Sequence, residues 1–345
     1  MPTDTYLSWV INNTKTCWWH DSADPRELDL GLERGAVGVT TNPFLCNLAL
    51  THNRALWGDQ IRQALAASDD PEARAQALMR IVVTAAAQKL RPQFEATGGR
   101  DGWVCAQVNP ARAGNRLRMT EMARRFHAWA PNIAVKLPAT SAGLDVLEDC
   151  IAEGITCTAT VSFTVPQVLA VGQRHRLGSQ RAAAKGIKPG RCFAVLMIGR
   201  LDDYLREVAE DTRADVSEAD IRQAGIAVAK RSAAIFAERG YEARLLVAAL
   251  RGSYHMTELA GGPFIMSIAP AYQGPLVSED LPREQGFDRP VAADVIARLS
   301  CMSEFVRSYE PQGMSPEQFI HFGLTQRTLT QFAEAGWRLL ETFSA

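Results

Sequence analysis

Short apolar runs alternate with longer amphipathic stretches along most of this chain. The runs are apolar on both faces, which is typical of strands in a parallel sheet that helices cover on both sides. Eight runs predict strands: Lys15–His20, Ala36–Thr41, Trp103–Val108, Ile133–Leu137, Ile155–Ser162, Cys192–Ile198, Arg244–Leu250 and Pro263–Ile268.

Helical patterns separate most of these runs. Thr164 and Ser217 stand where two of the helices should begin, and both residue types are good N-caps. The link Met256–Gly262 is short, so we expect a truncated helix there. The patterns predict helices over Pro71–Ala96, Asn115–Ala130, Ala142–Glu153, Val165–His175, Glu218–Arg239 and Asp288–Glu304.

The two ends of the chain add further helices to this alternation. Asp4–Asn13 predicts a helix before the first strand. Met314–Phe343 predicts one long amphipathic helix, or a helix pair, after the eighth unit. Pro316 suits the first turn of that segment, because its missing N–H would have no partner there anyway.

Eight strand–helix units within 345 residues predict an α/β fold, a closed (β/α)8 TIM barrel. We expect a single barrel domain over residues 1–345, with an extra N-terminal helix and a long C-terminal helix. An open doubly wound sheet is the alternative. The sequence weakens it, because no dinucleotide-binding glycine fingerprint follows the first strand.

Composition narrows the classes of partner and compartment. The net charge of -1 gives no overall field that would attract nucleic acid or an anionic membrane. The seven cysteines are scattered without a CxxC pair, which favours a reducing, cytoplasmic compartment with no disulfide framework and no zinc site. The sequence shows no secretory signal and no apolar run of membrane-spanning length.

A basic segment, Gln173–Arg191, could suggest phosphate or nucleic-acid binding. In a barrel, however, it would connect a helix to the next strand, at the face opposite the active site. We therefore interpret it as a solvated surface loop, which is what a run of charges usually is.

Lys136 stands alone in an apolar strand, between Val135 and Leu137. Burial disfavours the ammonium form of a lysine, and a neutral amine is a nucleophile for ketones and aldehydes. The alternative is a structural lysine whose stem is packed and whose head reaches water.

The ends of the predicted strands decide between these readings, because a barrel takes its reacting side chains from there. Asp21 follows the first strand, and Arg200 and Arg251 follow the sixth and seventh. The fifth strand carries a row of hydroxyls at every second position, which places them on one face: Thr156, Thr158, Thr160 and Ser162.

A lysine, a carboxylate and two arginines together suit Schiff-base chemistry on a sugar phosphate. Lys136 would attack a carbonyl, Asp21 would move a proton, and the arginines would hold a phosphate. This chemistry needs no cofactor and no metal. One tension remains: an anionic Asp21 close to Lys136 would favour the ammonium form and oppose the effect of burial.

Five segments resemble the transaldolase family of class I aldolases. The most specific are the Thr-Thr-Asn-Pro signature on strand two and the Val-Lys-Leu-Pro-Ala-Thr segment that carries the Schiff-base lysine. The resembling segments are Thr40–Pro43, Val135–Thr140, Gly154–Thr160, Ile198–Asp203 and Leu259–Pro270.

The resemblance implies a role for each matching position. It implies that Lys136 is the nucleophile, that Asp21 is the proton-transfer carboxylate and that Thr160 holds the catalytic water. Asn42 and Thr158 match residues that contact the donor, and Arg200 and Arg251 match the phosphate-binding arginines. It also implies that the long C-terminal helix packs across the barrel mouth, and it is compatible with a homodimer.

The departures from the family pattern concern the water and the substrate. The family's water-activating glutamate falls at Gln107, and an amide cannot accept a proton as a carboxylate does. The fructose 6-phosphate aldolase branch also has glutamine there but uses a tyrosine where this chain has Met197. Thr158 replaces an asparagine, and Val195 and Ala249 replace serines. The site is therefore expected to be less polar than the family's usual one.

The resemblance implies transfer of a dihydroxyacetone unit between a ketose or ketose phosphate and an aldehyde acceptor. One alternative is simple aldol cleavage or addition, which Gln107 favours slightly. Another is a non-catalytic relative that binds sugar phosphates, which the retention of both Lys136 and Asp21 argues against. We expect a small-molecule partner, with neither nucleic acid nor membrane involved.

Overall fold

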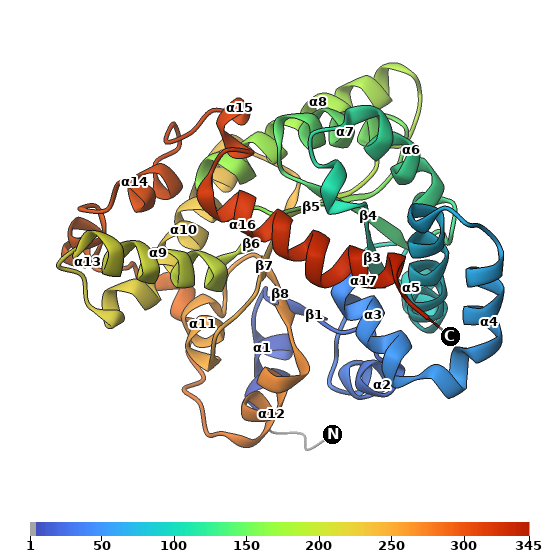
Figure 1. The fold of residues 1–345 in the computed structure, drawn as a ribbon. Coiled ribbons are helices and arrows are strands. Elements are labelled where there is room, and N and C mark those ends of the chain that lie inside the picture. The colour runs from blue at the N-terminus through green and yellow to red at the C-terminus, as the bar shows by residue number, and fades with distance from the viewer. Residues whose placement is uncertain (1–4, 345) are drawn as a thin grey trace.

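Eight parallel strands close into a barrel in the computed structural model, which describes residues 5–344. Each strand pairs with its sequence neighbours, and β1 also pairs with β8 (Figure 1). The predicted barrel is confirmed, and the open sheet was the wrong alternative. The strands are β1 Cys17–His20, β2 Gly38–Val39, β3 Trp103–Gln107, β4 Ile133–Pro138, β5 Cys157–Thr160, β6 Cys192–Met197, β7 Arg244–Ala248 and β8 Phe264–Ile268.

All eight strands fall at the predicted places, although most are shorter than the apolar runs. The difference matters most in β5, where Val161 has a φ of 53° and breaks the extended backbone. A positive φ is costly for a β-branched residue. The four predicted hydroxyls therefore do not form one continuous row, because only Thr158 and Thr160 lie within the strand.

Most of the predicted helices are confirmed within a few residues. The helix before β3 starts at Pro71 because Asp70 caps it and proline occupies its first turn. The predicted N-terminal helix is present from Tyr6, while Asp4 lies outside the described residues. These helices are α1 Tyr6–Asn13, α5 Pro71–Ala96, α6 Arg116–His127, α7 Ser141–Ala152, α10 Glu218–Arg239 and the short α11 Ser253–Leu259.

Five further helices were not predicted. Two of them begin with the same signal as α5, an acidic or amide cap followed by proline, at Asp24-Pro25 and Asn42-Pro43. That signal was readable and was missed because both helices are short or weakly amphipathic. The helices are α2 Pro25–Glu33, α3 Pro43–His52, α4 Arg54–Ala66, α9 Ile198–Thr212 and α12 Pro270–Ser278.

The prediction of one helix over Asp288–Glu304 was wrong. That stretch contains α13 Ala293–Leu299 and only the start of α14 Ser303–Tyr309, after a 3-10 turn that ends at Asp288. Pro290 follows the turn, and it cannot donate the backbone hydrogen bond that a continuous helix requires.

The prediction of a basic loop over Gln173–Arg191 was wrong for its first part, because helix α8 runs over Val165–Ala184 and only residues 185–191 form the loop before β6. Three of the six basic side chains therefore lie on a helix. Arg174 and Arg181 each pair with Glu148 on the neighbouring helix α7, at 2.8 Å. These ion pairs join two helices of the outer layer, so part of the segment's positive charge is balanced within the protein.

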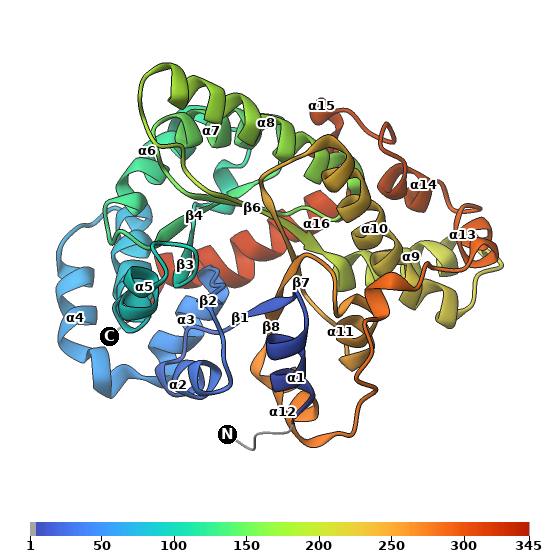
Figure 2. The same cartoon turned by 180° about the vertical axis from the view of Figure 1, so that it is seen from behind.

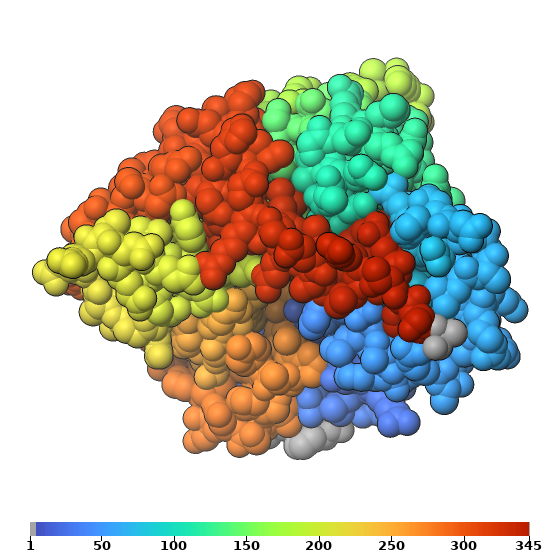
Figure 3. All heavy atoms as spheres, viewed as in Figure 1, coloured from blue at the N-terminus to red at the C-terminus, as the bar shows by residue number. Residues whose placement is uncertain are grey.

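The predicted long C-terminal segment crosses the mouth of the barrel (Figure 1). After the short α15 Pro316–Phe319, a continuous helical segment runs through α16 Gly323–Phe332, a π-helical turn Ala333–Trp337 and α17 Arg338–Glu341. The space-filling view shows this segment covering much of the mouth (Figure 3). Seen from behind, α1 lies beside β8 and α12, on the side opposite the C-terminal helix (Figure 2).

Aromatic side chains fill part of the barrel interior. Trp19 of β1 packs edge-on against Phe193 of β6, with ring centroids 4.6 Å apart. Trp103 of β3 approaches the same ring at 6.4 Å. Because side chains alternate along a strand, Asp21 and Met197 share the inward face with Trp19 and Phe193 and lie nearer the mouth.

Gly143 leaves no room for a side chain behind the strand that carries Lys136. A Cβ there would lie 1.9 Å from the carbonyl oxygen of Pro138. We expect Gly143→Ala to lower the free energy of unfolding by about 2 kcal/mol, since overpacked backbone must shift. Chemical denaturation measures this. As a control, Gly58→Ala meets only the tip of Arg62 at 3.5 Å and should leave stability unchanged or slightly raised. Equal effects of the two substitutions would contradict the claim that Gly143 has no room for a side chain.

Candidate active site

A cavity of about 220 Å³ opens at the C-terminal ends of the strands. Inward-facing residues of several strands line it, as the alternation of side chains requires. Six of the eight predicted site residues are among them: Asp21, Asn42, Lys136, Thr160, Arg200 and Arg251. The wall also includes the apolar side chains of Val195, Met197, Leu246 and Phe332.

Lys136 is held inside the barrel rather than at its surface. The residue is 7% exposed, and its Nζ donates a hydrogen bond to the carbonyl oxygen of Thr41 at 3.1 Å. The snorkelling alternative requires a hydrated head, so the structure does not support it. The amine instead faces the cavity from the middle of β4, with one backbone acceptor fixing its position.

Asp21 lies at the end of β1 and also lines the cavity. Its Oδ1 accepts a hydrogen bond from the hydroxyl of Thr40 at 2.7 Å, and the Oγ of Ser267 lies 2.6 Å from that hydroxyl. Burial raises the pKa of Asp21 above its ordinary value, and the bond from Thr40 and the charge of Lys136 oppose that rise only in part. The carboxyl group of Asp21 therefore takes up a proton more readily than an ordinary aspartate does.

Asn42 and Thr160 complete the polar wall. The Oδ1 of Asn42 caps α3 by accepting a hydrogen bond from the backbone N–H of Leu45 at 2.9 Å. That leaves the Nδ2 group as the part of the side chain that can donate to a ligand. Thr160 reaches only the sulfur of Met197, at 4.0 Å, so its hydroxyl has no strong partner within the described residues.

Gln107 and Thr158 do not line this cavity. Each is in register with Lys136, on β3 and β5 respectively, so all three side chains point into the barrel. The Oε1 of Gln107 is buried and has no hydrogen-bond partner. A buried acceptor without a partner is uncommon, and an ordered water is one way to satisfy it.

The two predicted arginines both line the cavity and differ in their partners. Arg200 lies in the first turn of α9 and not at a strand end. Its NH1 donates to the Oε1 of Gln331 at 2.6 Å, and its guanidinium stacks on the ring of Phe332. Arg251 donates twice to one carboxylate oxygen of Asp203, at 2.7 and 2.9 Å.

Comparison with known proteins agrees with this arrangement. A model of the family described as Transaldolase/Fructose-6-phosphate aldolase matches residues 18–334. The chain belongs to the transaldolase/fructose-6-phosphate aldolase family. The resemblance that the short motifs indicated is therefore confirmed over most of this family member.

The relatives of this transaldolase-family chain are distant. A protein named transaldolase from Neisseria gonorrhoeae is 31% identical over 189 residues, which cover 54% of this chain and 54% of that protein. Transaldolase 1 of Streptomyces avermitilis is 27% identical over 258 residues, which cover 73% of this chain and 67% of that protein. The chain thus spans about half to two thirds of the length of these curated relatives.

The described part of this family member has no membrane-crossing helix and no group of metal-binding side chains. Among residues 5–344, no helix is long and apolar enough to cross a bilayer. In the same residues, no group of three or more His, Cys, Asp or Glu side chains could hold a metal ion.

Several residues of the site were missed in the sequence. Thr40 and Ser267 belong to motifs that had been recognised, yet their contact with Asp21 depends on the pairing of β1 with β2 and β8. Gln331 and Phe332 come from the C-terminal helix, and no local pattern marks them as site residues. Only the closed barrel and its covering helix bring them together.

A buried pair behind Arg251 was also missed. The backbone N–H of Arg251 donates to Nδ1 of His255 at 3.1 Å, so Nδ1 carries no proton. The proton is therefore on Nε2, which lies 2.8 Å from the carboxylate of Asp202. Both side chains are fully buried. They hold the Arg251 backbone just after Ala249, whose φ of 57° is strained for a non-glycine residue.

This buried pair makes a testable contribution to stability. We expect Asp202→Ala and His255→Ala each to lower the free energy of unfolding by about 2 kcal/mol, since each leaves a buried partner unsatisfied. The double variant should lose about 1 kcal/mol less than the sum of the single losses, because the two share one network. Urea denaturation of all three variants measures this, and strict additivity would show that the pair does not act as a unit.

Proposed function

We propose that this protein transfers a dihydroxyacetone unit from a ketose phosphate to an aldehyde acceptor through a Schiff base on Lys136. The observation that carries the proposal is a buried primary amine that faces a cavity together with a carboxyl group of raised pKa. Family membership supports the same class of reaction.

The first half of the reaction uses the amine and the carboxylate in turn. The Nζ of Lys136 attacks the ketose carbonyl, and loss of water leaves an iminium ion. Asp21 then accepts the proton of the hydroxyl that becomes a carbonyl. As the carbon–carbon bond breaks, its electron pair moves into the iminium, so an enamine remains on Lys136 and an aldehyde departs.

The second half reverses these steps with another aldehyde. The enamine attacks the acceptor carbonyl, and Asp21 returns the proton to the new hydroxyl. Water then hydrolyses the iminium and releases the product ketose. The apolar wall around Lys136 suits this sequence because it limits the access of water to the enamine between the two halves.

Arg200 is suited to hold the anionic end of the substrate. Of the two arginines in the cavity wall, Arg200 has no ion pair within the described residues, whereas Arg251 is already paired with Asp203. A phosphate arriving at this place would gain charge-assisted hydrogen bonds from Arg200 without displacing a carboxylate. Arg251 could join it only by sharing or releasing Asp203.

Simple aldol cleavage is the second candidate, and Gln107 favours it. This side chain lies off the reaction cavity and carries an amide where the resemblance expects a carboxylate. An enamine that is protonated instead of captured yields free dihydroxyacetone. The two reactions therefore differ in whether that product appears when no acceptor is present.

Trapping the intermediate tests the proposal. We expect incubation with a ketose phosphate and borohydride to increase the mass of the protein by that of the reduced ketose phosphate or of its three-carbon fragment. The increase is stable because hydride reduces an iminium to an amine. Intact-mass spectrometry measures this. Lys136→Ala should abolish the adduct, while Lys89→Ala, which removes a surface lysine paired with Asp29, should form it normally. An adduct that survives Lys136→Ala would overturn the proposal.

The pH dependence of the reaction should follow Asp21. Carbon–carbon cleavage needs the carboxylate form, so kcat/KM should fall as the pH drops through the raised pKa of Asp21. Thr40→Val removes a hydrogen bond that stabilises the anion, so that pKa should rise further. We expect the acidic limb of the pH–rate profile to move up by about one unit.

The neighbouring threonine provides the control for this shift. The hydroxyl of Thr41 donates to the carbonyl of Cys105 and not to Asp21, so Thr41→Val should leave the acidic limb in place. If Thr40→Val leaves the limb unmoved, or if both variants move it equally, Asp21 is not the group that sets it.

A further inference from the structure

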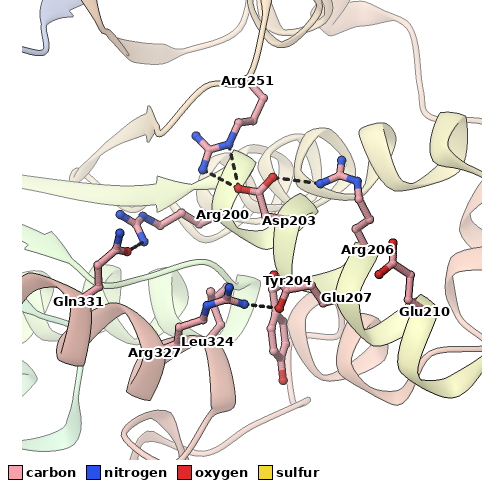
Figure 4. A pocket seen from close by; sticks show the side chains of 10 residues that line it. All are labelled: Arg200, Asp203, Tyr204, Arg206, Glu207, Glu210, Arg251, Leu324, Arg327 and Gln331. Atoms are coloured by element: carbon pink, nitrogen blue, oxygen red, sulfur yellow. Dashed lines mark hydrogen bonds and ion pairs between the residues drawn. The ribbon is translucent and has the colours of Figure 1, made fainter.

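A second and larger cavity adjoins the reaction cavity beyond the two arginines. Its volume is about 520 Å³, and we call it the vestibule. It shares Arg200 and Arg251 with the reaction cavity, so both arginines stand at the junction of the two spaces. The other side chains of the vestibule wall are Asp203, Tyr204, Arg206, Glu207, Glu210, Leu324, Arg327 and Gln331 (Figure 4).

Two helices form the walls of the vestibule. One stripe of α9 faces it, with residues spaced three or four apart from Arg200 to Glu210. One stripe of the C-terminal helix α16 faces it from the other side, at Leu324, Arg327 and Gln331. At 1.5 Å per residue, the α9 stripe is roughly 15 Å long, which is several carbon atoms beyond the reaction cavity.

Most of the charges in these walls neutralise one another. Asp203 pairs with Arg251 at 2.7 Å and with Arg206 at 3.0 Å. Glu207 pairs with Arg327, which ties α16 to α9 across the vestibule (Figure 4). Side chains paired in this way still present free donors and acceptors, so they can bind hydroxyl groups without strongly attracting a second charged group.

Two charged side chains of the wall have no ion pair within the described residues, Glu210 at the far end of the α9 stripe and Arg200 at the junction. The partners of Arg200 are the neutral Gln331 and the ring of Phe332. Burial, and then the positive charge of Arg251, lower the pKa of Arg200 to about 10, so it stays protonated at neutral pH. A single anionic group is therefore favoured at the junction, and a polar but uncharged chain is favoured along the vestibule.

Size separates the two spaces further. Sites for small molecules usually measure about 300–1,000 Å³. The reaction cavity, at about 220 Å³, falls below that range, whereas the vestibule, at about 520 Å³, falls within it. The reaction cavity suits the three-carbon unit bound to Lys136, and a longer partner needs the space beyond the arginines.

We infer that the vestibule binds the polyhydroxylated chain of a long aldehyde substrate, an aldose derivative of five or more carbons. This inference rests on the proposed function and names the class of its acceptor. The aldehyde carbon lies at the enamine on Lys136, and the chain passes Arg200 and Arg251. Its hydroxyl groups bind between α9 and α16. Because the reaction is reversible, the leaving aldehyde of a long ketose occupies the same space.

Glu210 offers a variant that narrows the vestibule without removing a contact. It is exposed and lines the vestibule, and its side chain has no hydrogen bond or ion pair within the described residues. Asp211 is the matched control, because it is also acidic and exposed on α9 but is not part of the wall. One residue further along the helix, its side chain points about 100° away.

The test is a ratio of specificities. Transfer is measured with glyceraldehyde, a three-carbon acceptor, and with glucose, an uncharged six-carbon acceptor. Both kcat/KM values are calculated on the open-chain aldehyde, because glucose is almost entirely cyclic in water. On that basis we expect the protein to use the long acceptor at least as well as the short one. Glu210→Trp should lower the ratio of kcat/KM for long over short acceptor by about tenfold, and Asp211→Trp should leave that ratio unchanged.

Three results would overturn the inference. They are a preference of the unaltered protein for the short acceptor, an unchanged ratio in Glu210→Trp, and an equal fall in both tryptophan variants. Borohydride trapping on the same samples separates this failure from failure of the proposed function. If the adduct on Lys136 forms while the ratio does not respond, the Schiff base stands and the vestibule does not bind the chain.

Discussion

The burial of one amine is the constraint on which the rest of this site depends. Lys136 is 7% exposed in the middle of β4, and a single backbone carbonyl, that of Thr41, holds its Nζ at 3.1 Å. A buried ammonium ion is costly unless it is paired. Asp21 supplies the opposite charge across the cavity, and burial makes that charge costly as well, as its raised pKa shows. The site therefore presents a buried amine and a carboxyl group of raised pKa to one cavity.

The barrel provides this arrangement, and the elements outside its strands refine it. The pairing of β1 with β2 and β8 brings Thr40 and Ser267 to Asp21. The first turn of α9 brings Arg200 to the cavity, and Gln331 of the C-terminal helix binds it. Behind Arg251, the buried pair of Asp202 and His255 fixes a strained backbone. Arg200 and Arg251, which can contact an anion, are thus positioned by residues of the C-terminal helix and of the buried pair.

The closed barrel could be predicted from the sequence because its evidence is local and repeated. Each apolar run carries its own signal, and an error of a few residues in any run leaves the count of units intact. Lys136 was predictable for a related reason, since an isolated lysine in an apolar run is visible without knowledge of its neighbours. Asp21, Arg200 and Arg251 were found because strand ends converge in a barrel, and all of them line the cavity.

The parts that were missed depend on contacts between distant segments. Nothing near Gln331 indicates that it meets Arg200, which lies 131 residues earlier. The break at Val161 could not be read from a regular alternation of hydroxyls, because that pattern continues through it. The place of Gln107 beside Lys136, in register with it but outside the cavity wall, required the pairing of β3 with β4. The residues that should decide the substrate depend on such contacts, whereas the nucleophile could be identified from the sequence.

A crystal structure of the protein reduced with borohydride in the presence of a ketose phosphate would test the role of Lys136 most directly. We expect continuous electron density from Nζ of Lys136 to the former carbonyl carbon of the substrate. We also expect a carboxylate oxygen of Asp21 within hydrogen-bonding distance of the hydroxyl next to the cleaved bond. Density for a sugar phosphate that lies apart from Lys136, or an adduct on another lysine, would contradict that role.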